Sequence, residues 1–208
     1  MNQTALTYAL TTSDRVLTRL GITGTAFTVM VDAMIAGVTD RIEGYCGGRR
    51  FKRTTYTNEL ITIRNQNQKF IAVKNIPLVS VSSLQYRTGL KSNPNYTDFN
   101  DNDWEIVNDG ASGMIRVHGL SQDINFCRIT YVGGYLIDFA NAGSPTAHTL
   151  PADISDLAER LTIKIFKKRE HEGKSSESFN GANVTWEKVL TEDDKEILSR
   201  YQRVPEFI

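Results

Sequence analysis

The chain has 208 residues, and its 24 basic and 24 acidic side chains cancel to a formal net charge of zero. This length suffices for one substantial hydrophobic core, or for one domain with a large insertion. A free-standing nucleic-acid-binding protein normally carries a basic excess, because neutralised phosphates supply most of its non-specific affinity. The charge balance therefore argues against tight DNA binding, while it permits a wall past which DNA slides.

Two cysteines, Cys46 and Cys127, have neither C-x-x-C spacing nor nearby histidines, so we expect no zinc site. We expect both thiols to be reduced, and a disulfide between them is the alternative that the sequence leaves open. The first ten residues lack the basic and apolar regions of a signal peptide. No run approaches the roughly 20 apolar residues of a membrane helix, so no membrane partner is predicted.

Two helices are predicted near the N-terminus. The Thr12-Ser13-Asp14 cluster is a helix cap, and Gly21 ends the short helix that follows. A longer helix is predicted over Phe27–Cys46, ending at Gly47-Gly48. Its threonines, valines and glycine cost roughly 3 kcal/mol relative to alanine. Burial of its apolar stripe contributes on the order of 10–20 kcal/mol as an upper bound, so packing decides for helix.

From Arg49 onward the pattern changes to short runs rich in threonine, isoleucine and aromatic residues, which predict strands of an antiparallel meander. The segment 88–103 is predicted to be a loop by its polar composition, and Asn108-Asp109-Gly110 to be a turn. The predicted strands cover residues 51–57, 60–64, 69–73, 78–87, 104–107, 113–118 and 124–131.

The segment Leu150–Lys168 predicts the central helix of the fold. Apolar residues recur at three- and four-residue spacing along it. Pro151, Asp153 and Asp156 suit a helix start, and the basic residues near Lys168 suit a helix end. Its stripe is expected to pack against the stripe of the second helix. The residues of this stripe are Ile154, Leu157, Ala158, Leu161, Ile165 and Phe166.

Beyond Gly173 the chain is polar and serine-rich, and we expect it to be mobile in the isolated subunit. Thr191 is predicted to cap a last helix with Ile197, Leu198 and Tyr201 on its apolar side. The predicted fold class is α+β, a helical bundle with an inserted antiparallel β-subdomain. We expect one domain over 1–208, with N-terminal helices at 12–47, the β-subdomain at 51–135, the long helix at 151–172, and a flexible segment, terminal helix and tail at 173–208.

Candidate chemistry is sparse. His118, His148 and His171 lie at no metal-ligand spacing and beside no nucleophile. The Gly47–Arg50 segment lacks the lysine-serine/threonine ending of a P-loop, so a turn is predicted. Asp98, Asp101 and Asp103 lack the glycine and final glutamate of an EF-hand loop. We therefore predict no catalytic residues, no bound metal and no cofactor, and a protein that is not an enzyme.

Four phrases, in order along the chain, resemble the head–tail connector proteins of long-tailed bacteriophages. Arg41–Phe51 is similar to a helix that closes on Tyr-Cys-Gly-Arg-Arg-Phe, and Ile76–Leu84 to a "Pro-Val-Thr-Ser-Val" strand. Ile129–Tyr135 with Leu150–Ile154 is similar to a "Val-Thr-Tyr-Thr-Ala-Gly-Tyr … Pro-x-Asp-Leu" joint. The stretch 168–178 resembles "Arg-Arg-x-x-Gly … Ser-Glu-Ser". The chain departs from the pattern in a long β insertion and in the doubled glycine.

The resemblance implies a virion protein of the neck, assembled in the host cytoplasm. Such an adaptor would form a ring with itself, expected to be a dodecamer of about twelve subunits, beneath the portal protein. It would extend the DNA channel, with DNA only as passing cargo. It would also offer a docking surface to the next component, a stopper or tail-completion protein.

On this resemblance we hypothesise that the C-terminal segment from Thr191 contacts the portal. Ring contacts are assigned to the β-subdomain and to the outer face of the long helix, where Arg160 is expected to be an exposed position. Alternatives are another neck or tail component (a stopper or tail terminator), a small hydrolase using the Asp98–Asp103 loop, and a DNA-binding module. A helical content well above one third would favour the adaptor over the β-rich stopper class. The candidate portal contacts are Arg200, Tyr201, Arg203, Phe207 and Ile208.

Overall fold

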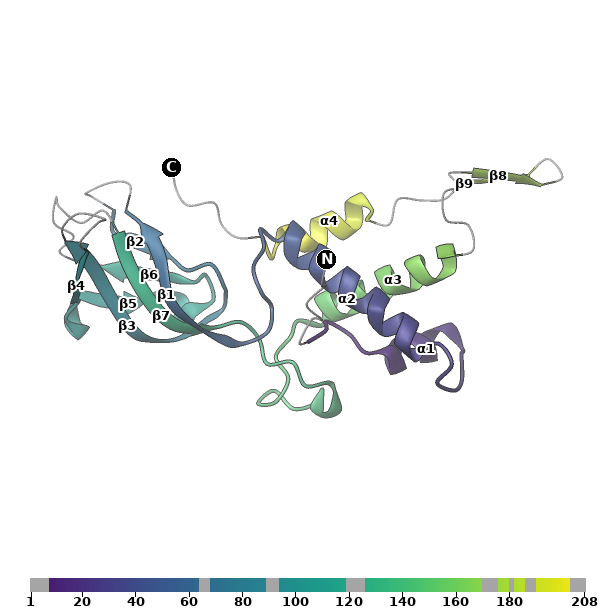
Figure 1. Cartoon of the computed structure of the whole chain (residues 1–208), viewed down its shortest axis with the longest axis horizontal. Helices are drawn as coiled ribbons and strands as arrows, with labels where there is room; N and C mark the ends of the chain where they lie inside the picture. The colour runs from purple at the N-terminus through teal and green to yellow at the C-terminus, as the bar shows by residue number, and fades with distance from the viewer. Residues whose placement is uncertain are drawn as a thin grey trace. The chain divides into compact units, whose positions relative to one another are not determined.

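The structure is a computed structural model of the whole chain (Figure 1). It divides into two compact units. The helical unit comprises the described residues of Met1–Gly48 and Asp138–Gln202, and the β unit comprises those of Arg49–Ile137. Strands at 176–179 and 182–185 are described by their backbone alone. The structure describes residues 8–63, 68–88, 94–118, 126–169, 176–179, 182–185 and 190–202.

The first helix, α1 (Ser13–Leu20), has the predicted limits. The Thr12 hydroxyl accepts a 3.4 Å hydrogen bond from the Arg15 N–H at its start. Gly21 ends it in the left-handed region at φ 70°, where its N–H bonds the carbonyls of Leu17 and Thr18. Both boundaries therefore follow from residues within one turn of the helix ends.

Two long helices pack against each other as predicted: α2 (Thr28–Tyr45) and α3 (Ala152–Lys168) lie side by side in Figure 1. Their apolar stripes are buried, and α1 adds to the same core. The ring of Phe27, just before α2, meets the ring of Phe166 edge-on at 5.7 Å between centroids. This core contains Val16, Leu17, Val31, Ile35 and Phe166, with Met30, Met34 and Ile163 packed around it.

The last helix, α4 (Glu192–Ser199), begins at the predicted cap, a capping box formed by Thr191 and Asp194. Leu198 is fully buried, and the Cys46 thiol donates to its carbonyl at 3.8 Å. The segment predicted to be mobile contains a two-stranded antiparallel hairpin, β8 (Ser176–Phe179) and β9 (Ala182–Thr185).

The first sheet of the β unit has four antiparallel strands in the order β1-β7-β3-β4. The predicted strands at 51–57 and 60–64 are one continuous strand, because a bulge between Tyr56 and Glu59, with Asn58 at φ 56°, keeps the pairing with β7. Its strands are β1 (Thr54–Thr62), β3 (Leu78–Thr88), β4 (Asn95–Asp98) and β7 (Phe126–Gly133).

The second sheet has three antiparallel strands in the order β2-β6-β5. Its apolar side chains, such as Ile71 and Ile115, share one core with Leu84 and Ile129 of the first sheet. The two sheets therefore enclose the core of the β unit. The strands are β2 (Phe70–Ala72), β5 (Trp104–Ile106) and β6 (Met114–Val117), and single 3₁₀ turns cover Asp101–Asp103, Asn108–Gly110 and Phe139–Asn141.

The prediction of a loop over 88–103 is wrong in part. Asn95–Asp98 forms β4, which pairs with residues 85–88 of β3. Its polar side chains gave no strand pattern, and the pairing partner across the sheet decides its conformation. The predicted turn at Asn108–Gly110 is confirmed: Gly110 has φ 80°, and a Cβ there would lie 1.8 Å from the Leu78 carbonyl oxygen.

Within the described residues, the helical content does not rise well above one third, the threshold set from the sequence. The four α-helices contain 8, 18, 17 and 8 residues, which is just under one third of the residues that the structure describes. The β insertion is long, so it dilutes the bundle. The α+β class with an inserted antiparallel β part is nevertheless the observed fold.

Candidate interaction surfaces

Within the described residues, no group of three or more His, Cys, Asp or Glu side chains is placed to hold a metal ion. His118 is exposed at the end of β6. The Nδ1 atom of His148 accepts a 3.0 Å hydrogen bond from the Asp138 N–H. His171 lies outside the described residues. No hydrogen bond between either of the two described histidines and a nucleophilic side chain is present among the described residues.

Asp98, Asp101 and Asp103 have separate local roles. Asp98 lies in β4 and accepts a 2.8 Å hydrogen bond from the Gln85 side chain. Asp101 and Asp103 begin and end a 3₁₀ turn, and Asp103 accepts from the Asn100 amide at 3.0 Å. These contacts fix the end of β4 and the turn after it.

The glycine-arginine segment after α2 forms a turn that hydrogen bonds hold in place. Gly48 has φ 70°, and its N–H bonds the Glu43 carbonyl at 2.8 Å. Arg49 is fully buried. Its Nη2 donates to the Ile76 carbonyl at 2.5 Å, and its guanidinium lies 4.6 Å from the centre of the Phe51 ring. An arginine held in this way is part of the core of the β unit, which agrees with the predicted turn.

A buried polar cluster of the β unit is built around Tyr131 and Asn75, and the Asn75 side chain accepts a hydrogen bond from the Arg50 N–H. The Tyr131 hydroxyl donates to Glu59 at 2.8 Å and accepts from the backbone and side-chain N–H groups of Asn75 at 3.1 and 3.2 Å. Glu59 also accepts from the Lys74 N–H at 3.0 Å. Burial raises the pKa of Tyr131, so its hydroxyl stays protonated and keeps donating. The cluster joins the bulge of β1 to the turn before β3.

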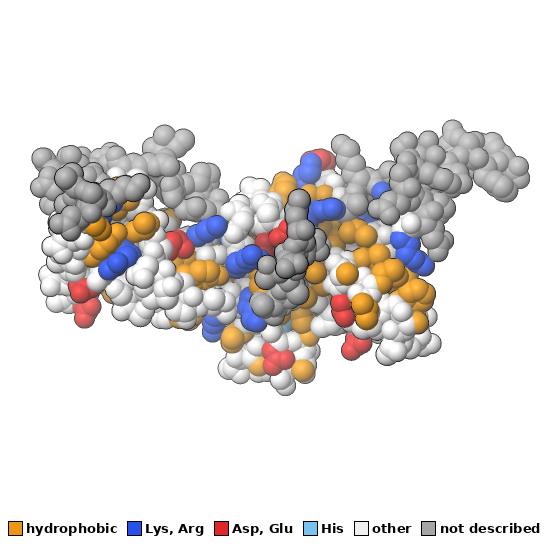
Figure 2. Space-filling model, viewed as in Figure 1, with side chains coloured by type: hydrophobic (Ala, Val, Ile, Leu, Met, Phe, Trp, Pro, Cys, Tyr) orange, Lys and Arg blue, Asp and Glu red, His pale blue; other side chains and the backbone are white. Residues whose placement is uncertain are grey.

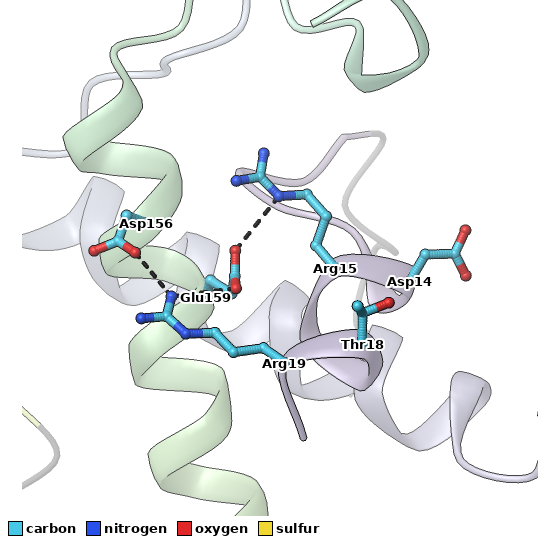
Figure 3. Close-up of a pocket in the computed structure, with 6 residues that line it drawn as sticks. All are labelled: Asp14, Arg15, Thr18, Arg19, Asp156 and Glu159. Atoms are coloured by element: carbon cyan, nitrogen blue, oxygen red, sulfur yellow. Dashed lines mark hydrogen bonds and ion pairs between the residues drawn. The ribbon is translucent and has the colours of Figure 1, made fainter. Parts of the chain in front are cut away.

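A charged hollow of about 520 Å³ lies between α1 and α3 in the helical unit. Figure 3 shows Arg15 and Arg19 of α1 reaching toward Glu159 and Asp156 of α3, with Asp14 directed elsewhere. Arg19 Nη1 lies 2.8 Å from Asp156 and 3.2 Å from Glu159, and Arg15 Nε lies 3.4 Å from Glu159. Hydrogen bonds to these carboxylates raise the pKa of Arg19. The charges pair with one another and hold α1 on α3.

A second charged network attaches α4 to α3. The Asp194 side chain is only 1% exposed, and it accepts from Arg160 at 3.1 Å and from Lys164 at 3.2 Å. Arg160 also bonds Asp156 at 2.9 Å. Burial alone would raise the pKa of Asp194, but the hydrogen bonds from Thr191 and Lys164 outweigh it and lower the pKa. The start of α4 is therefore fixed on α3 by a buried carboxylate.

The predicted contact residues have different surroundings in the structure. Arg160 is half-buried and paired inside the chain, so the expectation that it is an exposed position is wrong. The Tyr201 hydroxyl donates to the Asp153 carboxylate at 2.7 Å. The Arg200 side chain is 65% exposed and lies 3.9 Å from Glu196. Arg203, Phe207 and Ile208 lie outside the described residues.

Surface charge follows the neutral composition. The face drawn in Figure 2 carries basic, acidic and apolar side chains interspersed over both units. Cys46 and Cys127 are buried and free, as expected, and burial raises the pKa of Cys127 to about 12. No described helix is both long enough and apolar enough to cross a bilayer.

Sequence reasoning nominated no residue on the outer face of the first sheet, where the structure places Arg87 over the Phe126 ring and Arg128 over the Tyr96 ring. The alternation of buried and partly exposed residues along β3 and β7 was the signal that could have found them. That alternation alone does not place either arginine over its ring, because the register between strands is a tertiary property.

Two solved structures have a similar fold. One chain, described as "Neck of empty GTA particle computed with C6 symmetry", shares 15% identity at a TM-score of 0.56, over 93% of this chain and 90% of that chain. Another, described as "Neck of native GTA particle computed with C12 symmetry", shares 14% identity at a TM-score of 0.52, over 87% and 86%. No curated protein matches the sequence.

A family model described as "Head completion protein" matches residues 9–204. The match spans nearly the whole chain and includes both units. It confirms the resemblance seen in the four phrases and the prediction of a structural virion component that is not an enzyme. The chain belongs to the head completion protein family.

Proposed function

We propose that this protein is the adaptor of a phage-like neck, forming a ring beneath the portal that extends the DNA channel. The family match over residues 9–204 carries the proposal. Two structural relatives come from neck structures computed with C6 and C12 symmetry. A head-to-tail interface that closes by rotation generates such a ring, and about twelve subunits would match a twelve-fold neck.

The charge of the chain suits DNA that passes through without being held. Twenty-four basic and 24 acidic side chains cancel. Tight phosphate contacts would anchor DNA and make its retention strongly dependent on salt. A neutral wall avoids this cost, so DNA is proposed as cargo and not as a bound ligand.

The C-terminal segment is the proposed portal contact. The side of the ring that faces away from the portal is the proposed dock for a stopper or tail-completion protein. The attachment of α4 to α3 through Asp194 gives this segment a fixed base. Arg200 extends from that base with a largely exposed side chain. Tyr201 is engaged with Asp153, so it would contribute to the portal contact mainly through its ring. Arg203, Phe207 and Ile208 complete the proposed contact set.

The assembly state tests the proposal. The mass of the purified protein is measured alone and after mixing with the portal protein of the same particle, and the mixture is imaged by negative stain. A ring of about twelve copies on the portal is expected. Copies that remain unattached at concentrations where the portal is intact would overturn the proposal.

A truncation tests the portal contact separately. Removal of Gln202–Ile208 is expected to abolish portal attachment while the unfolding transition of the remaining chain is kept. Gln202→Ala serves as the matched control and should attach normally. Normal attachment of the truncated chain would reject the C-terminal segment as the contact.

A ring contact by Arg160 needs a variant that separates assembly from folding, since Arg160 also pairs with Asp156 and Asp194. Arg160→Gln should be compared with Asp194→Asn, which breaks the same internal pair. Loss of ring closure in the first variant alone would support a direct contact. Equal behaviour of the two variants would assign Arg160 to the internal network only.

A stopper or tail terminator is the alternative, and a helical content just under one third of the described residues does not separate it from an adaptor. The order of binding does. An adaptor binds the bare portal, whereas a stopper binds only after an adaptor is in place.

A further inference from the structure

The first sheet of the β unit has one face in the core and a second face with a different chemistry. Cys127, Ile129 and Leu84 point into the core. The residues that alternate with them form one row across the strands, in which Leu60 pairs with Arg128, Arg128 with Gln85, and Gln85 with Asp98. The neighbouring row contains Thr62, Phe126, Arg87 and Tyr96. We call this surface the outer sheet face.

Two arginines of the outer sheet face lie over aromatic rings. The Arg87 guanidinium carbon is 4.0 Å from the centre of the Phe126 ring, and that of Arg128 is 3.8 Å from the Tyr96 ring. Arg128 Nε also donates to the Gln85 side chain at 2.9 Å. Neither arginine forms an ion pair with a carboxylate of the described residues. Stacking holds each guanidinium in place and leaves N–H groups at its edge for a carboxylate.

The composition of this face is that of an interface centre. Arginine and tyrosine dominate binding hot spots, and an apolar anchor completes them. Leu60 provides that anchor, since it is 58% exposed in the same row as Arg128. The face therefore fits a protein surface that brings carboxylates and an apolar side chain together.

The helical unit carries a surface of that kind on the side of α2 opposite its core. Val29 and Asp40 lie on this side, opposite the buried Val31, Ile35 and Val38, and the exposed Asp32 lies at its edge, in line with the buried Thr39 and Glu43. Val29 is 83% exposed, and both aspartates are exposed without an ion pair to any described residue. We call these three residues the exposed α2 patch. Arg41, which follows Asp40 in the chain, is also exposed. The surface complementary to the arginines is formed by the two aspartates and Val29 alone.

We infer that the outer sheet face of one copy binds the exposed α2 patch of a neighbouring copy. The inference rests on the proposed ring, and it names the surfaces that close it. The two surfaces are different patches of the same chain, as a head-to-tail ring requires. Asp32 and Asp40 supply carboxylates for Arg87 and Arg128, and Val29 packs with Leu60. A helix laid across a sheet face is a common way of burying both.

Paired charge reversals test the inference. One variant carries Arg87→Glu with Arg128→Glu, and another carries Asp32→Arg with Asp40→Arg. Each should lower the fraction of subunits in rings by about tenfold or more, because like charges then face each other. Lys69→Glu with Asp101→Lys is the control for charge reversal elsewhere on the surface: both residues are exposed and lie on neither surface, so this variant should assemble like wild type.

An equimolar mixture of the two reversed variants is the decisive arm. Every junction in an alternating ring of the mixture joins opposite charges, so rings with an even number of subunits should return. Their return also shows that both variants are folded. The inference is overturned if the separate variants assemble like wild type, or if the mixture does not recover rings. Failure of the wild type itself to form rings, with or without portal, would count against the proposed function instead.

Discussion

Arg160 on α3 donates a 3.1 Å hydrogen bond to the carboxylate of Asp194 on α4, across 34 positions of sequence. Asp194 also accepts from the Thr191 N–H at 3.0 Å and from the Lys164 amine at 3.2 Å. One buried carboxylate thus caps α4 and attaches it to α3. The segment that begins at α4 is the proposed portal contact, so this relationship connects the stability of the bundle to assembly.

Replacement of this carboxylate should loosen α4. Asp194→Ala removes the cap, takes the carboxylate away from Lys164 and leaves Arg160 paired with Asp156 alone, and we expect a loss of about 2 kcal/mol in the free energy of unfolding. Chemical denaturation measures it. Glu196→Ala is the control, since its pair with Arg200 is exposed at 3.9 Å and should contribute less than about 0.5 kcal/mol. Equal stability of the two variants would contradict the assigned role of Asp194.

Acid should weaken the bundle in a defined direction. The pKa of Asp156 and that of Asp194 are lowered in the folded chain: burial opposes the shift, and hydrogen bonds from Arg19 and Arg160 to Asp156, and from Thr191 and Lys164 to Asp194, outweigh it. The folded state therefore binds these protons less readily than the unfolded state. Their contribution is present above the unfolded pKa, near 4, and is lost as the pH falls through the folded pKa.

Denaturation curves recorded between pH 7 and pH 3 check this dependence. The double variant Asp156→Asn with Asp194→Asn should be less stable at pH 7 and should lose less stability on acidification than wild type. Parallel pH profiles of the two proteins would show that other carboxylates govern acid unfolding.

The charged hollow should control the attachment of α1. Glu159 is 8% exposed and pairs with both Arg15 and Arg19. Glu159→Ala should cost about 1–2 kcal/mol and should speed amide hydrogen exchange in residues 13–20 more than in α2. Thr18→Ala, at a position that lines the same hollow without an ion pair to any described residue, should not speed exchange. Uniformly faster exchange over the bundle would argue against a local attachment.

The Tyr131 cluster should stabilise the β unit. Tyr131→Phe removes a donor to Glu59 and an acceptor for Asn75, and leaving these buried groups unpaired should cost about 1–3 kcal/mol. Tyr86→Phe is a matched change in the same core, where no described residue bonds the hydroxyl. Thermal unfolding compares them, and a larger loss in Tyr86→Phe would reject the cluster as a support.

Local signals determined the helices from sequence alone. The caps at Thr12 and Thr191, the stop at Gly21 and the apolar stripe of α3 act within a few residues, so α1, α3 and α4 begin and end near their predicted positions. The family phrases were also visible in the sequence. The structure gives them physical reasons, such as the burial of Arg49 against Ile76 and Phe51.

Only the tertiary structure decided the sheet and the surfaces. The polar segment Asn95–Asp98 becomes β4 through pairing with β3, and the bulge at Asn58 merges two predicted strands into β1. Arg160 pairs with Asp194 and is only partly exposed, and Arg87 lies over Phe126 because of the strand register. Caps and stripes are encoded by neighbours in the chain. Register and charge pairing depend on residues that are far apart in sequence, so they appear only when the chain has folded.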